Sequence, residues 1–186
     1  MNAKLHKQQG FTLVEIAIVL VIIGLLLGAV FKGQELIGQA KVKNAQKQFD
    51  EIRAAYYTYL DKKNTVAGDD GTNGGTANDG IVDSNNSFWN NLQTENLVNG
   101  TGGTAPNNPY GIALIVAGNT ANYLCSKMPE KAAEQIDIKA DDGNATTGSF
   151  IWTGTTQPAL GTDPTTQTAA YANPATDTLG WLCTKF

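Results

Sequence analysis

The hydrophobic pattern of the chain is strongest near its start. From Phe11 to Phe31 the residues are almost continuously apolar, and only Thr12 and Glu15 are clearly polar. At about 1.5 Å per residue, a helix over this segment is about 31 Å long, which matches the hydrocarbon core of a bilayer. The pattern therefore predicts a membrane-spanning helix over 11–31.

Beyond Phe31 the helical pattern continues but becomes amphipathic. Apolar residues recur at spacings of three and four and so share one helix face: Ala45, Phe49, Ile52, Tyr56 and Leu60. Charged residues fill most other positions, and no proline precedes Pro106. We expect one helix from Phe11 to about Lys62. Its second half, 32–63, is expected to pack against a folded domain.

The remainder, 64–186, predicts that domain. A polar loop over Asn64–Asn86 follows the helix, and a short helix is expected over Phe88–Leu97 with Ser87 as its N-cap. Strands are expected over Ile112–Ala117, Ala121–Cys125, Ser149–Thr153 and Leu179–Cys183. The fold class is therefore α+β, with a long N-terminal helix packed on a small antiparallel sheet.

Two further segments complete the expected domain. Pro129 can begin a short helix through Gln135, because proline is tolerated in a first helical turn. Thr153–Thr178 is poor in apolar residues and is expected to be a surface loop.

The charge balance is mildly acidic, with 13 Lys and Arg against 17 Asp and Glu. Lys4 and Lys7 both precede Gly10, so the rest of the chain is more acidic still. Because a DNA-binding surface needs clustered Lys and Arg, we expect no nucleic-acid partner. The only histidine, His6, also precedes Gly10, which argues against histidine-based catalysis in the rest of the chain.

Acidic residues raise the question of a metal site. Asp69, Asp70, Asp79 and Asp83 could offer oxygens to calcium, and Asp141 and Asp142 are weaker candidates. The spacing matches no EF-hand loop, and Asp–Gly clusters usually form solvated turns. No nucleophile or oxyanion motif accompanies the carboxylates. We therefore expect no metal, no cofactor and no enzymatic activity.

The two cysteines, Cys125 and Cys183, are far apart and form no CxxC motif, which leaves a zinc or thioredoxin-like site unsupported. In an oxidising compartment they could form one bridge, worth about 4 kcal/mol by loop entropy. In a cytosolic protein they would be two buried thiols. Export of 64–186 by a membrane anchor favours the bridge.

A short polar leader, Met1–Gly10, precedes the apolar segment, and no Ala-x-Ala site follows it, so the anchor is expected to be retained. Lys4 and Lys7 favour a cytoplasmic N-terminus, although Lys32 on the other flank weakens that signal.

The junction Gly10-Phe11-Thr12-Leu13-Val14-Glu15 resembles the processing motif of the type IV pilin family, which includes the type II secretion pseudopilins. The resemblance covers the leader, the junction and the long helix. It implies cleavage after Gly10 by a prepilin peptidase and N-methylation of Phe11. It also implies an inner-membrane protein that joins identical or related subunits, through the pilus assembly machinery, in an extracellular filament.

Glu15 is the one acid in the apolar segment. An ionised group there is costly unless it is paired, and it is less costly near a helix end. In a staggered assembly Glu15 can meet the Phe11 amine of a neighbouring subunit, which is the role that the family gives this position. In the alternative, Glu15 reaches the headgroups beside its own amine and needs no partner.

By this resemblance we expect a structural subunit of a type IV pilus. The Cys125–Cys183 bridge would bound a C-terminal region that in pilins faces outward and varies the filament surface. A type II secretion pseudopilin remains open, although major pseudopilins typically lack such a cysteine pair. A DNA-binding minor pilin is a further alternative, but few lysines follow Asn64. The sequence is equally compatible with a filament that serves adhesion, motility or DNA uptake.

Overall fold

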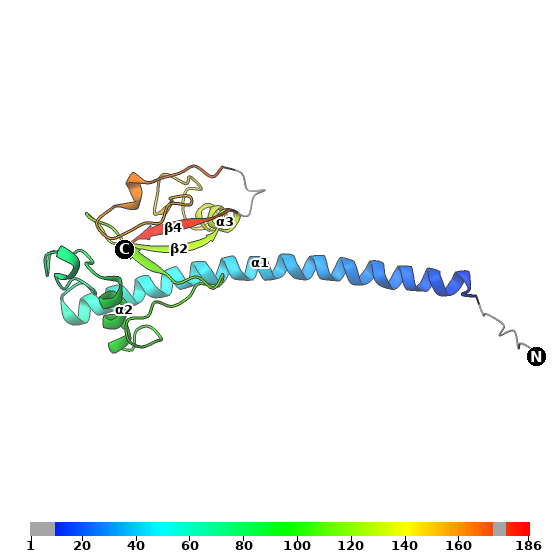
Figure 1. Ribbon diagram of the computed structural model, residues 1–186, viewed down its shortest axis with the longest axis horizontal. Coiled ribbons are helices and arrows are strands. Elements are labelled where there is room, and N and C mark those ends of the chain that lie inside the picture. Colours follow the sequence, from blue (N-terminus) through cyan, green and yellow to red (C-terminus); the bar gives the residue numbers. More distant parts are fainter. Residues whose placement is uncertain (1–9, 173–177) are drawn as a thin grey trace, which may run out of the picture. The chain divides into compact units, whose positions relative to one another are not determined.

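The computed structural model describes residues 10–172 and 178–186. Its elements, in chain order, are α1 (Leu13–Lys63), the 3-10 turn η1 (Thr72–Gly74), α2 (Asn85–Thr94), β1 (Ile115–Ala117), β2 (Tyr123–Pro129), α3 (Glu130–Ala140), β3 (Phe150–Trp152), the 3-10 turn η2 (Pro164–Thr166) and β4 (Leu179–Lys185) (Figure 1). The chain divides into two compact units, of which the first ends at Ala40 and the second comprises Lys41–Phe186.

The first unit contains the apolar part of α1, a helix of 51 residues. No side chain between Phe11 and Ala40 is buried, and every large apolar side chain from Phe11 to Ile37 is exposed. This part of α1 has a mean hydropathy of 3.0 over its most apolar window and satisfies the length and composition of a membrane span. By these two properties it suits the membrane anchor that the sequence predicts over 11–31.

In the second unit, α1 buries one stripe of its surface. The buried residues are Val42, Ala45, Phe49, Ile52, Ala55 and Tyr56, and Leu60 packs against the same core. Their spacings of three and four confirm the amphipathic face expected from the sequence. Charged side chains, among them the ion pair of Lys47 and Glu51 at 3.0 Å, lie on the solvent side.

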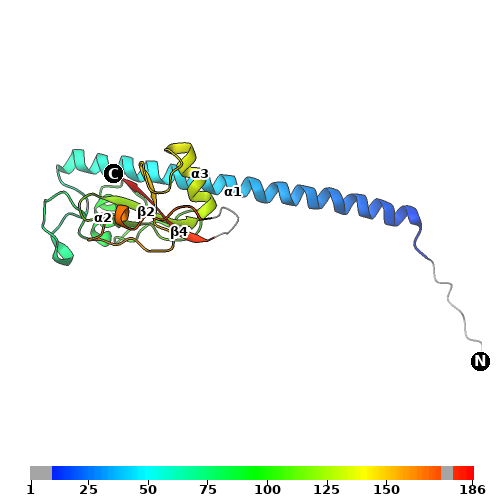
Figure 2. The same cartoon turned by 90° about the horizontal axis from the view of Figure 1, so that it is seen from above.

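The second unit also holds a four-stranded antiparallel sheet with the order β1-β2-β4-β3. Side chains alternate between its two faces, as strand geometry requires. Leu124 and Leu182 join the main core with α1, whereas Tyr123 and Trp181 join a smaller cluster on the opposite face. In Figure 2, β2 and β4 lie beside the second part of α1. The α+β class, with a long helix on a small antiparallel sheet, is confirmed.

Aromatic contacts join α1 to the sheet and to α2. The Phe49 ring meets Phe150 of β3 edge to face, with centroids 5.5 Å apart. Tyr56 stacks on Phe186 at 4.4 Å, and Phe88 of α2 lies 6.4 Å from Tyr56. These rings fill the space between the helix and the strands, which explains why α1 carries tyrosine and phenylalanine after Val42.

Several boundaries differ from the sequence-based expectation. The N-cap of α2 is Ser84, whose hydroxyl accepts the Ser87 N–H at 3.2 Å, so Ser87 is not the cap and the helix begins at Asn85. The expected strands are otherwise present with shifted ends. β2 continues to Pro129 because β4 pairs along its whole length. The helix expected to end at Gln135 continues as α3 to Ala140.

The loop after α1 is more ordered than its composition suggests, because its aspartates hold turns. Asp69 accepts the N–H groups of Asn78 and Gly80, and Asp83 accepts the Gly71 N–H at 2.7 Å. Asp70 and Asp79 each accept an N–H group two residues ahead. These four carboxylates therefore serve as hydrogen-bond acceptors within turns, while Ala67 and Val82 of the same loop are buried in the main core.

The segment before β4 is only partly the surface loop that its composition predicts. Ala169 donates its N–H to the Trp152 carbonyl, and Tyr171 packs against the core with its ring 5.8 Å from that of Trp152. Pro164 is buried. Residues 173–177 lie outside the described residues. Scattered apolar side chains are enough to anchor this polar segment at several points.

The packing of Phe49 yields a stability prediction. Phe49 is 1 % exposed, so Phe49→Ala leaves a cavity between α1 and β3 and should lower the free energy of unfolding by about 3–5 kcal/mol. Glu51→Ala, on the solvent side of the same helix, should change it by less than about 0.5 kcal/mol. Denaturant unfolding of both variants in a mild detergent measures the difference. Equal effects would show that the helix does not pack as described.

Candidate functional site

Three exposed residues precede α1. Gly10, Phe11 and Thr12 have no helical assignment, and α1 begins at Leu13. A Cβ built on Gly10 would meet no atom within 4 Å. The peptide bond between Gly10 and Phe11, where cleavage is expected, therefore lies outside the helix and is accessible.

Thr12 and Glu15 form a reciprocal cap at the N-terminus of α1. The Thr12 hydroxyl accepts the Glu15 N–H at 3.2 Å. In return, the Thr12 N–H and hydroxyl both donate to Glu15 Oε2, each at 2.8 Å. This is the capping box, in which Thr stands at the N-cap and Glu at the third helical position. It satisfies two backbone N–H groups that the helix itself cannot.

The capping box changes the interpretation of Glu15. Its carboxylate is hydrogen-bonded within its own chain and lies at the helix end where the macrodipole favours an anion. The apolar pattern alone indicates only an electrostatic role for Glu15. The T-x-x-E spacing of Thr12-Leu13-Val14-Glu15 is the signal that could have revealed the cap. Thr12 is thus a functional candidate that the apolar pattern did not reveal.

An ion pair marks the far boundary of the apolar segment. Lys32 and Glu35 form an ion pair at 2.8 Å, and Gln39 donates to Glu35. Both charged side chains are more than half exposed. Between Glu15 and Lys32 the helix has no ionisable residue. The segment between them is uniformly apolar, as a lipid or helix-packed environment requires.

The glycines of this part of α1 have no structural purpose within the first unit. A Cβ built at Gly24, Gly28, Gly33 or Gly38 would meet nothing within 4 Å. Glycine weakens an isolated helix relative to alanine. Small residues do allow close approach of neighbouring helices in apolar surroundings. The glycines are therefore suited to contacts with helices of other chains.

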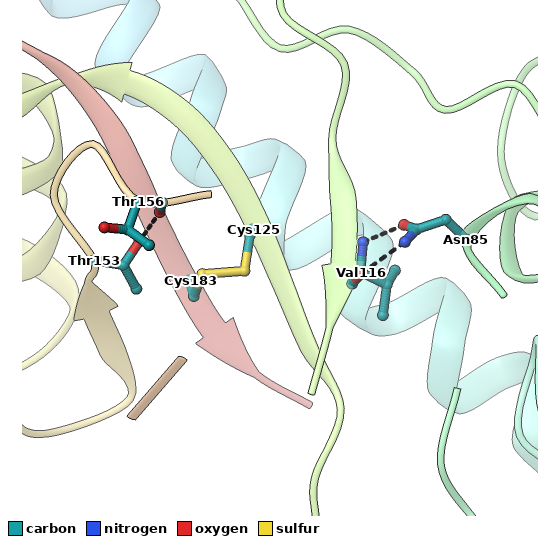
Figure 3. The surroundings of a disulfide bond; sticks show 6 residues. All are labelled: Asn85, Val116, Cys125, Thr153, Thr156 and Cys183. Atoms are coloured by element: carbon teal, nitrogen blue, oxygen red, sulfur yellow. Dashed lines mark hydrogen bonds between the residues drawn. A yellow bond between two sulfur atoms is a disulfide. The ribbon is translucent and has the colours of Figure 1, made fainter. Parts of the chain in front are cut away.

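The structure brings the two cysteines together. Cys125 of β2 and Cys183 of β4 stand opposite each other in the strand register and form a disulfide (Figure 3). Both are fully buried on the face of the sheet away from the main core. The bridge joins residues 58 positions apart, and the chain between them includes α3 and β3. It therefore fastens the two central strands of the sheet.

Both edges of the sheet are closed by groups of the same chain. At β1, the Asn85 amide donates to the Val116 carbonyl at 2.8 Å and accepts the Val116 N–H (Figure 3). At β3, Trp152 donates its N–H to Ala145 and accepts that of Ala169, each at 2.8 Å. Unpaired edge strands are templates for pairing with another chain. Here these edge groups are already paired.

The disulfide gives the second stability prediction. Replacing both residues, Cys125→Ala with Cys183→Ala, should lower the free energy of unfolding by about 2–4 kcal/mol, because the unfolded chain regains the freedom of a long loop. A reducing agent should destabilise the unaltered protein by a similar amount and leave the double variant unchanged. Denaturant unfolding with and without reductant tests this. A reductant effect that persists in the double variant would contradict it.

Comparison with known protein families finds a match at the N-terminal part of the chain. The family model described as the prokaryotic N-terminal methylation motif matches residues 5–31, which include the exposed junction, the capping box and the apolar segment up to Phe31. No curated protein and no solved structure matches the chain significantly.

Proposed function

We propose that this chain, whose N-terminal methylation motif marks it as a precursor of the type IV pilin or pseudopilin type, is the structural subunit of a type IV pilus filament. In this proposal 1–10 is a leader that a prepilin peptidase removes after Gly10, and Phe11 becomes the N-methylated first residue. Segment 11–31 anchors the subunit in the inner membrane and later forms the filament core. Segments 32–63 and 64–186 are exported with it.

The observation that carries the proposal is the exposed apolar surface of α1 up to Ile37, which follows directly on the matched junction. Lipid can cover this surface before assembly, and the helices of other subunits can cover it afterwards. The open glycine positions support the second arrangement, because they let helix backbones approach closely. A structural subunit needs no catalytic residues in addition to this surface.

The closed edges of the sheet support assembly through α1. Asn85 occupies the hydrogen-bonding groups of Val116 at one edge, and Ala145 and Ala169 occupy those of Trp152 at the other. A subunit whose edge groups are paired cannot extend the sheet into its neighbour at these positions. Polymerisation then depends on the apolar helix.

Glu15 has two separable tasks in this proposal. The capping box satisfies its hydrogen bonds but leaves its formal charge. In an apolar filament core, an uncompensated charge is costly. We propose that the methylated amine of Phe11 on a neighbouring subunit supplies the opposite charge and so sets the axial register of each added subunit.

Two variants separate the charge from the cap. Glu15→Gln removes the charge but keeps a capping box, since glutamine serves equally at that position. Loss of an ion pair from each subunit contact should lower the yield of surface filaments by about tenfold or more. Thr12→Ala keeps the charge and costs about 1 kcal/mol of capping, so filaments should still form. Electron microscopy and the yield of sheared filaments measure both.

The reverse result would reject the register role. If Glu15→Gln cells assemble normal filaments and Thr12→Ala cells do not, the cap alone accounts for Glu15. Immunoblots of whole cells provide the control, because both variants should accumulate to the level of the unaltered subunit.

Mass spectrometry of sheared surface filaments tests the assignment itself. The chain should be the bulk component, should begin at methylated Phe11, and should carry Cys125 and Cys183 as a disulfide.

The type II secretion pseudopilin is the second candidate, since it shares the same anchor. The Cys125–Cys183 bridge is the observation that favours the pilus. Absence of the chain from surface filaments, together with a secretion defect on its deletion, would favour the pseudopilin.

A further inference from the structure

Three carboxylates converge at the C-terminal end of α3. Oxygens of Asp137, Asp141 and Asp142 all lie within 4.8 Å of one another. Asp137 stands in the last turn of α3, and Asp141 is its C-cap. We call these three residues the acidic cluster. Among the described residues it is the only group of three acidic, histidine or cysteine side chains gathered this closely.

The second observation is an unpartnered oxygen on Asp137. Its side chain is fully buried, and Tyr171 donates its hydroxyl to Oδ2 at 3.0 Å. Oδ1 is also buried and has no hydrogen-bond partner among the described residues. Buried polar atoms are almost always paired, and a carboxylate oxygen is among the most costly to leave unpaired. The hydroxyl of Tyr171 does not cancel the charge.

The position of the acidic cluster makes this arrangement less favourable still. The C-terminal end of a helix carries a partial negative charge and favours cations. Lys139 is the only basic residue in the last turn of α3, and it is exposed. No ion pair joins Lys139 to the cluster within the described residues. The site therefore gathers negative charge without a side-chain cation to balance it.

We propose that the acidic cluster binds a calcium ion, with the free Oδ1 of Asp137 as its buried ligand. Calcium–oxygen distances are about 2.3–2.6 Å, so two ligands of one ion lie at most about 5 Å apart, which the cluster satisfies. All three donors are carboxylate oxygens, which suit a hard cation and do not suit zinc or copper. Calcium fits better than magnesium because irregular loop ligands rarely form an ideal octahedron.

The ion would connect three parts of the fold. Asp141 also accepts the N–H groups of Ser149 and Phe150, where β3 begins. Asp137 is bonded to Tyr171, in the segment that leads to β4. Calcium would therefore fasten the end of α3 to the edge of the sheet and to this segment. Because the unfolded chain lacks this arrangement, binding stabilises the folded state.

The test uses the full chain purified in mild detergent and freed of metal with a chelator. Calorimetric titration with CaCl₂ should show one site with a dissociation constant of about 0.1–1 mM, as for extracellular calcium modules. Calcium at about 10 mM should raise the thermal unfolding midpoint by a few degrees, and magnesium should raise it less.

A matched pair of variants localises the site. Asp142→Asn should weaken calcium binding by about tenfold or more, since it removes one of three charged ligands. Asp79→Asn is its control, because both aspartates accept an N–H two residues ahead at 2.9 Å. Asp142 differs in that it also accepts the Thr147 hydroxyl at 2.6 Å. Asparagine preserves the bond to the N–H in both variants, so Asp79→Asn should leave binding unchanged.

Two results would overturn the proposal. One is the absence of calcium binding to the unaltered chain up to about 10 mM. The other is an equal loss of affinity in Asp142→Asn and Asp79→Asn, which would place the ion elsewhere. The inference does not rest on the proposed function, because it is measured on isolated subunits. Its failure would leave the filament experiments unaffected.

Discussion

An apolar helix surface with no partner in its own chain must be covered by lipid or by other helices, and this constraint organises the protein. From Ile16 to Phe31, α1 offers no polar face that could lie in water, and up to Ala40 it offers no side chain that its own chain buries. Within lipid the apolar surface is already satisfied, so close packing and specific polar contacts must drive helix association. The open glycines and the carboxylate of Glu15 are the features of α1 that can supply them.

The carboxylate of Glu15 illustrates how one group can meet two requirements. As the third residue of a capping box, it lets α1 begin at Leu13 with its first N–H groups satisfied. A neutral glutamine would do this equally well, so capping does not explain a charged residue. The charge needs a cation nearby in an apolar phase, and cleavage after Gly10 would create one at Phe11. The capping hydrogen bonds fix the position of the Glu15 carboxylate, and its negative charge requires a cationic partner.

The sequence predicted those parts of the fold that arise from local periodicity. The change from an apolar to an amphipathic pattern located the two halves of α1, and the stripe through Phe49 and Tyr56 is buried as expected. Period-2 patterns located all four strands. The N-cap of α2 was misplaced because Ser84 and Ser87 lie within one turn, and either could cap a helix by composition alone.

The features that the sequence did not reveal depend on contacts between distant segments. Nothing near Asn85 indicates that its amide closes the edge of β1 at Val116. Asp137 looks like an ordinary helix residue until the fold buries it beneath Tyr171. Asp141 and Asp142 were considered as metal ligands without this third carboxylate. Side chains that act through long-range contacts leave no periodic signal, because their partners are chosen by the packing of the whole domain.

The apolar segment of α1 and the domain have opposite requirements for association with other chains. The domain after Lys41 must be stable alone and must not aggregate through its sheet, and the disulfide of Cys125 with Cys183 and the paired edge groups meet that need. In the proposed filament the segment before Ala40 must associate, and its exposed apolar surface does nothing to prevent this. In that filament the exposed apolar helix would be the adhesive surface of the subunit. Growth would then follow a single helical register, because no competing sheet contact is available at the paired edge positions to divert it.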